Sequence, residues 1–302
     1  MYSFLKLVLF AVLSVLSAQL VPCLSYVIPQ RMLIIGCGNL GSDVACHFKN
    51  AGTHITATTT NISNAKLYQY VDDVLLFNDD NKHKLKKTLS EIDHVFISVV
   101  PKEHNTYENI ANNIAKYVEN IPKRVHIAYI SSVSAYGTIT NGDEVDEYYN
   151  KSTIFNSRAL DLLCAENIMQ NLQSNGHSVS IFRPQALLSS KSANNDLSMV
   201  KWASGKRLPK TYGDAYMGVS HHDEIIKAYK WCLKKNIEGV ININNPPFIR
   251  RTFFDTVCDK YKIPRPMWVD DKIQNVDNKR IVCKKLIDSG YEFLIPDVMN
   301  LR

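Results

Sequence analysis

Three glycines directly behind a short apolar segment constrain the fold of this chain more than any other feature of its sequence. The apolar segment covers residues 32–35, and residues 39–50 have the apolar spacing of a helix that ends before Gly52. Across this junction the chain reads Gly36-Cys37-Gly38-Asn39-Leu40-Gly41, which is G-x-G-x-x-G. The first glycine of such a motif allows a tight turn, and the third allows the helix to pack closely against the strand. The motif therefore predicts a strand, a tight turn and a helix.

The same alternation of strand and helix continues along the chain. Apolar, β-branched segments predict further strands at residues 55–60, 74–77, 94–100, 125–131, 179–182 and 240–244. Helical apolar spacing covers residues 83–92, 108–118, 156–172, 222–234, 253–261 and 283–288. Strands that alternate with helices form a parallel sheet with helices on both faces. We therefore expect an α/β fold with a Rossmann-type, doubly wound parallel sheet and a small C-terminal lobe.

The glycine turn also has a chemical interpretation, because its second glycine lets a pyrophosphate approach the backbone. The N–H groups and the dipole at the start of the next helix then face the phosphates. A purely structural turn is the alternative, but the position of the motif in the first strand–helix unit favours binding of a dinucleotide, NAD or NADP. The residues expected to contact this cofactor are Gly36, Gly38, Asn39, Leu40, Gly41, Thr59, Thr60, Asn61, Val100, Pro101 and Ser131.

The end of the second predicted strand helps to distinguish the two cofactors. The chain reads Thr58-Thr59-Thr60-Asn61 there, without the acidic residue that would bind the ribose 2′-hydroxyl of NAD. Its absence removes a charge that would repel a 2′-phosphate, and threonine and asparagine can donate hydrogen bonds to one. No arginine stands at this point to clamp the phosphate. We therefore prefer NADP, with NAD as the alternative.

The predicted elements divide the chain behind residue 30 into two parts. Residues 31–185 form an NAD(P)-binding domain, and residues 222–245 return to it. Residues 186–221 and 246–302 form a small lobe that would hold the substrate.

Residues 1–25 differ from the rest of the chain. Lys6 is the only charge before Arg31, and an apolar segment follows it up to about Val21. Small residues then lead to a possible cleavage point after Ser25, which is typical of a signal segment. A retained membrane anchor is the alternative. If the segment is cleaved, we expect no stable membrane span in the remaining chain.

The other cysteines are scattered and form no C-x-x-C pair, so they indicate buried thiols and not a disulfide framework. A secretory signal combined with reduced thiols suggests a reducing organelle such as a complex plastid; otherwise the protein is secreted or lumenal. The charge of the chain gives little support for nucleic-acid binding. The net charge is +6, and the densest lysine run, at residues 82–87, has no interleaved aromatic residues. We therefore expect no nucleic-acid partner.

Several later motifs carry a family resemblance. They are Ser131-Ser132-Val133-Ser134-Ala135-Tyr136-Gly137, the acidic turn at 142–147, the segment 220–225, and the pairs Lys279-Arg280 and Gly290-Tyr291. In this order and spacing they resemble the extended, NAD-dependent epimerase/dehydratase-like branch of the short-chain dehydrogenase/reductase superfamily, and the C-terminal pairs resemble an atypical subgroup. The similarity runs from Arg31 to the C-terminus and implies a nicotinamide cofactor and a small-molecule substrate.

The resemblance implies catalytic roles that this chain fills only in part. It assigns Ser132 to orient a substrate oxygen beside the nicotinamide. The family uses a Tyr-x-x-x-Lys pair about 25 residues further on, where the lysine lowers the tyrosine pKa, but Arg158 and Leu162 stand at these positions. We therefore consider Tyr136 as a substitute proton donor, with Arg158 binding an anionic substrate or a cofactor phosphate. The alternatives are a structural Tyr136 and a solvent-exposed Arg158.

Two functions remain open from the sequence. The first is an atypical oxidoreductase or epimerase/dehydratase-like enzyme that acts on a small, anionic or sugar-nucleotide-like molecule. The second is a non-catalytic NAD(P)-binding redox sensor or partner-binding protein, which the missing tyrosine–lysine pair would suit. The retained serine pair and C-terminal lobe lead us to favour the enzyme. No metal site is expected, because adjacent residues such as His221 and His222 point apart. A homodimer is left open.

Overall fold

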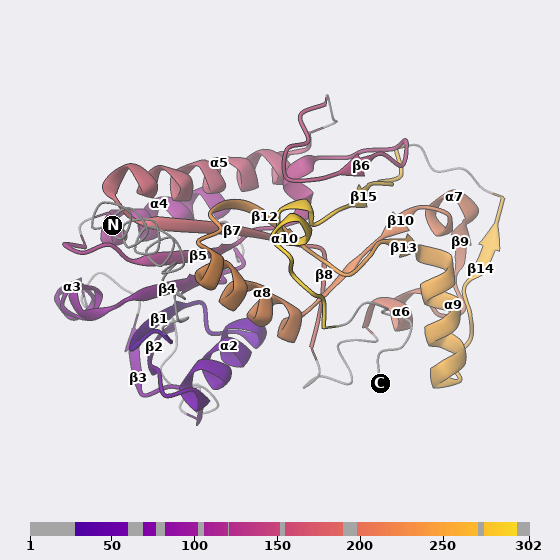
Figure 1. Ribbon diagram of the computed structural model, residues 1–302. Helices are drawn as coiled ribbons and strands as arrows, with labels where there is room; N and C mark the ends of the chain where they lie inside the picture. Colours follow the sequence, from indigo (N-terminus) through magenta and orange to yellow (C-terminus); the bar gives the residue numbers. More distant parts are fainter. Residues whose placement is uncertain are drawn as a thin grey trace, which may run out of the picture.

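The computed structural model describes residues 28–59, 69–76, 82–101, 106–119, 121–151, 155–189, 198–270 and 275–294 (Figure 1). The predicted signal segment at 1–25 lies outside these ranges, so the secretory route that depends on it stays a prediction. Within the described ranges, no helix combines the length and the apolar character needed to cross a membrane.

A parallel sheet of seven strands forms the centre of the molecule, in the order β12-β7-β5-β4-β1-β2-β3. Its strands are β1 (Arg31–Ile35), β2 (His54–Thr59), β3 (Asp73–Leu76), β4 (His94–Ile97), β5 (His126–Ile130), β7 (Ser178–Pro184) and β12 (Gly239–Ile243). The order reverses direction between β1 and β4, where the chain crosses from one half of the sheet to the other. The predicted doubly wound α/β fold is therefore confirmed.

Helices cover both faces of this sheet (Figure 1). They are α2 (Asn39–Asn50) and α8 (His222–Lys235) on one face, with α4 (Tyr107–Val118) and α5 (Ser157–Asn171) on the other. Strand β1 shows why two covered faces are needed. Met32 and Ile34 belong to the core against α2 and α8, whereas Leu33 and Ile35 belong to the core against α4. Successive side chains of a strand point to opposite faces, so an unbroken apolar strand is stable only when both faces are buried.

The remaining helices and short strands are distributed around this centre. The helices are α3 (Lys82–Glu91), α6 (Ser198–Ala203), α7 (Lys210–Gly213), α9 (Arg250–Tyr261) and α10 (Lys284–Asp288), with 3-10 turns η3 (Val133–Tyr136) and η4 (Leu172–Asn175). The short strands are β6 (Glu144–Val145), β8 (Ala186–Leu188), β9 (Arg207–Pro209), β10 (Tyr216–Met217), β11 (Val219–His221), β13 (Phe248–Ile249), β14 (Met267–Val269) and β15 (Arg280–Ile281). They pair two by two, as β10 with β13, β8 with β11, β9 with β14 and β6 with β15.

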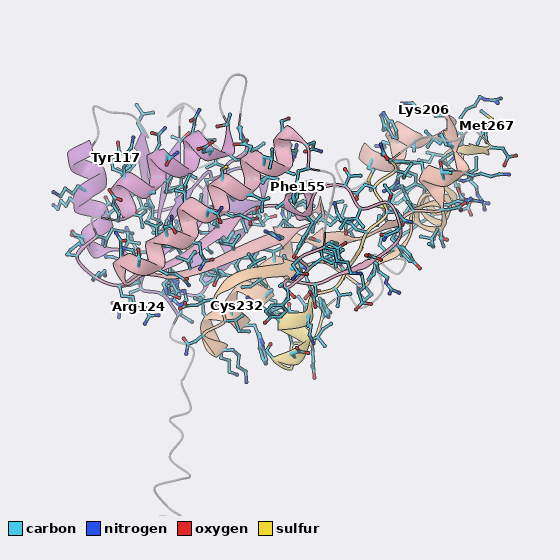
Figure 2. All side chains as sticks on the ribbon, turned by 90° about the horizontal axis from the view of Figure 1, so that it is seen from above. Tyr117, Arg124, Phe155, Lys206, Cys232 and Met267 are labelled. Atoms are coloured by element: carbon cyan, nitrogen blue, oxygen red, sulfur yellow. The ribbon has the colours of Figure 1, made fainter. Side chains whose placement is uncertain are left out.

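A separate apolar core holds the small lobe together. Phe253 and Phe254 of α9 pack with Val200 of α6 and Met217 of β10, and the Trp268 ring lies against them. In Figure 2, Lys206 and Met267 mark the end of this lobe, far from Tyr117 and Arg124 of the main sheet region. The small lobe thus has an apolar core of its own beside the C-terminal ends of β7 and β12.

Candidate functional site

The three glycines of the turn after β1 differ in what surrounds them. Gly36 has a φ of +86°, and a Cβ there would lie 2.5 Å from the carbonyl oxygen of Ser98. A Cβ on Gly41 would lie 2.5 Å from the carbonyl oxygen of Gly36, so α2 can approach the turn only with glycine at this position. At Gly38, no atom of the residues that the structure describes lies within 4 Å of where a Cβ would stand. Two glycines are therefore required by packing, while the third faces open space.

The start of α2 borders this open space. Gly38 is the N-cap of α2, and no side chain caps the helix there. Gly38 and Asn39 are exposed, whereas the Leu40 side chain is buried in the core, so Leu40 can offer a ligand only its backbone. Uncapped N–H groups at a helix N-terminus attract anions. The space that a Cβ would fill at Gly38, next to these donors, fits the pyrophosphate of a dinucleotide.

The other predicted cofactor residues are placed in different ways. Thr59 ends β2 and is half-buried, whereas Thr60 and Asn61 lie outside the described residues. Val100 and Pro101 follow β4, and the Val100 side chain is 71% exposed. The Ser131 hydroxyl, in contrast, is buried and donates to the Glu166 carboxylate. Ser131 can thus offer a cofactor little beyond its backbone.

Ser132 is the first of the predicted catalytic residues. It lies just behind the carboxyl end of β5, and its side chain is half-buried. Its Oγ caps η3 by accepting from the Ser134 N–H at 3.1 Å, and it donates to the Ser134 Oγ at 3.2 Å. A hydroxyl oxygen has two lone pairs, so Ser132 keeps acceptor capacity beside its existing partner. This position suits a side chain that orients a substrate oxygen.

The Tyr136 side chain turns into the protein. It is 6% exposed, and its hydroxyl donates to the Asn242 Oδ1 of β12 at 2.9 Å. Burial raises the pKa of Tyr136 to about 12. Its ring lies under the Arg183 guanidinium, 4.3 Å from the ring centroid. These contacts give Tyr136 a place in a buried polar cluster and oppose proton transfer by its phenol near neutral pH.

A buried ion pair lies at the centre of that cluster, and the sequence had not singled it out. Arg183 of β7 donates from Nε to the Glu166 Oε1 at 2.9 Å and from Nη2 to the Oε2. Burial by itself would lower the pKa of Arg183, but the hydrogen bonds and charge of Glu166 outweigh it and raise the pKa. The pair ties α5 to β7, and through Ser131 it holds the end of β5. The available signal was a charged residue, Arg183, directly after the predicted strand at 179–182.

Arg158 lies in the first turn of α5 and is exposed. Its guanidinium carbon is 5.9 Å from the centroid of the Tyr107 ring at the start of α4. One turn further along α5, Leu162 is fully buried. The neighbouring Asp161 accepts from the backbone N–H groups of Tyr107 and Glu108, each at 2.9 Å, and so caps α4. This part of α5 joins two helices, and Arg158 remains exposed there together with Ser157 and Leu160.

The two adjacent histidines before and in α8 have separate partners. The His221 Nδ1 caps α8 by accepting from the Asp223 N–H at 3.2 Å. The His222 Nδ1 lies 2.7 Å from the Asp43 Oδ2, and both side chains are buried. Because Asp43 belongs to α2, this contact connects the helix of the glycine turn to α8. In the described ranges, no group of three or more His, Cys, Asp or Glu side chains could hold a metal ion.

No protein-family profile and no curated protein matches the sequence. Solved structures with the same fold do match. A candidate epimerase from Burkholderia cenocepacia J2315 has a TM-score of 0.73 at 16% identity, covering 89% of this chain and 94% of its own. The Bordetella bronchiseptica enzyme WbmG, in complex with NAD and UDP, has a TM-score of 0.70 at 17% identity, covering 93% of each chain. UDP-glucose 4-epimerase from Thermotoga maritima, with UDP-glucose, has a TM-score of 0.67 at 12% identity, covering 88% and 94%. The chain therefore has the fold of NAD-dependent epimerase/dehydratase-like proteins.

Proposed function

We propose that this chain binds a nicotinamide dinucleotide at the carboxyl ends of β1, β4 and β5. The observation that carries the proposal is the open space over Gly38 beside the uncapped start of α2. The backbone N–H groups of the turn would hold the pyrophosphate, and the packed contacts of Gly36 and Gly41 keep the turn in place without a ligand. NAD in the complexes of WbmG supports a cofactor of this class.

The choice between the two cofactors belongs to the proposal. Thr59 ends β2, and neither it nor the threonine and asparagine that follow it carries a charge to repel a 2′-phosphate. We therefore propose NADP as the preferred cofactor. Tighter binding of NADH than of NADPH would contradict this choice.

We further propose that the protein is an atypical epimerase/dehydratase-like enzyme or oxidoreductase acting on a small anionic or sugar-nucleotide-like molecule. A bound nicotinamide supplies a hydride acceptor or donor in such a site. Ser132, at the end of β5, would orient the reacting oxygen of the substrate. The Tyr136 hydroxyl is held by Asn242, so a water molecule is the better proton carrier, and Tyr136 positions the segment behind Ser132. A homodimer stays a prediction of the sequence.

One structural relationship favours the second candidate function, a dinucleotide sensor without catalysis. Two titratable side chains near the expected proton relay already have partners within the protein. Asp161 of α5 accepts from the Tyr107 N–H, and Tyr136 of η3 donates to Asn242. A chain that binds the cofactor but lacks a proton relay would respond to the dinucleotide without turnover.

Two measurements on the purified protein test these proposals. Separate titrations with NADH and NADPH, followed by nicotinamide fluorescence, should show saturable binding of at least one, and binding of neither would contradict both functions. Incubation with sugar nucleotides and carbonyl compounds, followed by product analysis and by deuterium exchange with labelled cofactor, should then show turnover of one substrate. Binding without any exchange would favour the sensor.

A further inference from the structure

Arg250 differs from the other arginines that the structure describes. Most of them lie within salt-bridge distance of a carboxylate: Arg31 with Glu91, Arg124 with Glu238, Arg183 with Glu166, Arg251 with Asp214, Arg265 with Asp259 and Arg280 with Glu144. Arg158, Arg207 and Arg250 have no such partner among the described residues, and the first two are exposed. Arg250 is partly buried, so its charge loses hydration without gaining a counter-ion.

The surroundings of the Arg250 guanidinium fix its position but use few of its donors. The guanidinium carbon lies 4.0 Å from the centroid of the Tyr212 ring, and Nη1 donates to the Tyr212 carbonyl oxygen at 2.9 Å. A guanidinium has five N–H donors in a planar fork. Burial lowers the pKa of Arg250, and electrostatic interactions with Tyr212 and Asp277 only partly oppose this effect. The group is thus a positioned, partly dehydrated cation, and the described residues accept from only one of its N–H donors.

The position of Arg250 connects it to the segment that carries Ser132. Asp277, whose charge acts on Arg250, accepts from the Ile139 N–H at 3.2 Å. Ile139 follows η3, the turn that Ser132 caps. In Figure 1, β13, which directly precedes Arg250, pairs with β10 beside β15 and not at the outer end of the lobe. Arg250 therefore lies on the side of the small lobe that is linked, through Asp277, to the segment behind Ser132.

We propose that Arg250 binds an anionic oxygen group of the substrate, a phosphate or a carboxylate. A bidentate ion pair would use the free edge of the guanidinium fork and supply the missing counter-charge. Tyr212 keeps the fork in one orientation, which reduces the side-chain entropy lost on binding. The inference rests on the proposed function, because it places the anion on the substrate of the dinucleotide site.

Calorimetric titrations of the full chain in the presence of saturating NADPH, the proposed cofactor, test the proposal with three probes: UDP, inorganic pyrophosphate and succinate. The unsubstituted protein should bind at least one of them. Arg250→Gln should weaken that binding about ten- to hundred-fold, the usual effect of losing hydrogen bonds to a charged group. Arg250→Lys keeps the charge without the planar fork and should give an intermediate loss.

Arg251→Gln is the matched control, because it removes the same charge from the same helix turn, where Arg251 pairs with Asp214. It should bind the probe as the unsubstituted protein does. Equal affinities of the unsubstituted protein and Arg250→Gln, or of the two glutamine variants, would overturn the proposal, as would failure of the unsubstituted protein to bind any probe. If Arg250→Gln does not fold, Arg250→Lys decides by the same comparison. Tighter binding of UDP and pyrophosphate than of succinate assigns a phosphate, and the reverse a carboxylate.

Nicotinamide fluorescence in the same samples separates this inference from the proposed function. Normal NADPH binding with unchanged probe affinity in Arg250→Gln overturns the role of Arg250 alone. Failure of the unsubstituted protein to bind either NADPH or NADH contradicts the dinucleotide site itself.

Discussion

The Tyr136 hydroxyl donates to the Asn242 side chain at 2.9 Å, and this hydrogen bond joins the turn behind β5 to the edge strand β12. Asn242 in turn donates from Nδ2 to the carbonyl oxygens of Val145 and Val282. The tyrosine that the sequence offered as a substitute acid is thereby placed in a structural network.

Tyr136→Phe should lower the free energy of unfolding by about 1–3 kcal/mol, because it leaves the Asn242 Oδ1 buried without its donor. NADH affinity should stay within about two-fold of the original. Urea unfolding and fluorescence titration check the two expectations. Tyr148→Phe, at a side chain that is 65% exposed, is the control and should change neither. Lost turnover in Tyr136→Phe with unchanged stability would restore the tyrosine as a proton donor.

The glycine turn allows folding and binding to be separated. Gly38→Ala should leave the melting temperature nearly unchanged, because the new Cβ meets no atom within 4 Å. It should weaken NADH or NADPH binding at least about ten-fold by blocking hydrogen bonds to the charged pyrophosphate.

Gly41→Ala provides the opposite case. Its Cβ would lie 2.5 Å from the Gly36 carbonyl oxygen, so it should destabilise the fold by about 1–3 kcal/mol. Equal melting temperatures of the two alanine variants would contradict the packing that distinguishes these glycines. Thermal unfolding followed by circular dichroism makes the comparison.

The ion pair of Glu166 and Arg183 should be among the most sensitive points of the fold. Glu166→Ala leaves a buried guanidinium without its counter-ion and should cost about 3–5 kcal/mol. Glu91→Ala breaks a solvent-exposed pair with Arg31 and should cost less than about 1 kcal/mol. Chemical denaturation of both variants measures the difference, and similar losses would show that burial of the pair is unimportant.

Two stacked histidines at the amino ends of β4 and β5 should make the fold sensitive to acid. The rings of His94 and His126 lie 5.4 Å apart, and burial together with His126 lowers the pKa of His94 to about 3. Burial also lowers the pKa of His126. Both are neutral in the folded protein, whereas the unfolded chain binds protons near pH 6.5. Their contribution is therefore fully present above that pH and falls as the pH decreases, for His94 down to about 3, by up to about 1.4 kcal/mol per pH unit for each histidine.

Urea unfolding between pH 7.5 and 5 checks this expectation. His94→Asn should reduce the loss of stability over this interval. His54→Asn, at a more exposed histidine paired with Asp73, is the control and should retain the loss. An unchanged pH dependence in His94→Asn would disprove the role of the stacked pair.

The sequence was sufficient for the main sheet but not for the connections around it. Apolar segments and their spacing predicted the seven strands and the main helices, because burial on one or two faces leaves a periodic pattern. The short strands of the small lobe have two or three residues each, too few for any period to appear. Helix α9 begins at Arg250, three residues before its predicted start, because Ile249 offers no side-chain cap that the sequence would reveal.

The site was predictable only where chemistry depends on neighbours along the chain. The glycine spacing was visible at once, and so was the serine pair behind β5. The partners of Tyr136 and Ser131 are 106 and 35 residues away, and a single sequence carries no signal for such pairs. Whether Arg158 is exposed or bound likewise depends on Tyr107, which belongs to another helix.

The unequal surroundings of the three glycines also have an evolutionary consequence. Mutations at Gly36 and Gly41 are removed by selection for folding, whatever the protein does, since both positions are closed by neighbouring backbone. Gly38 is under no such constraint, so only selection for the ligand can preserve it. In a lineage of this protein, the persistence of glycine at that one codon would record whether the dinucleotide is still in use.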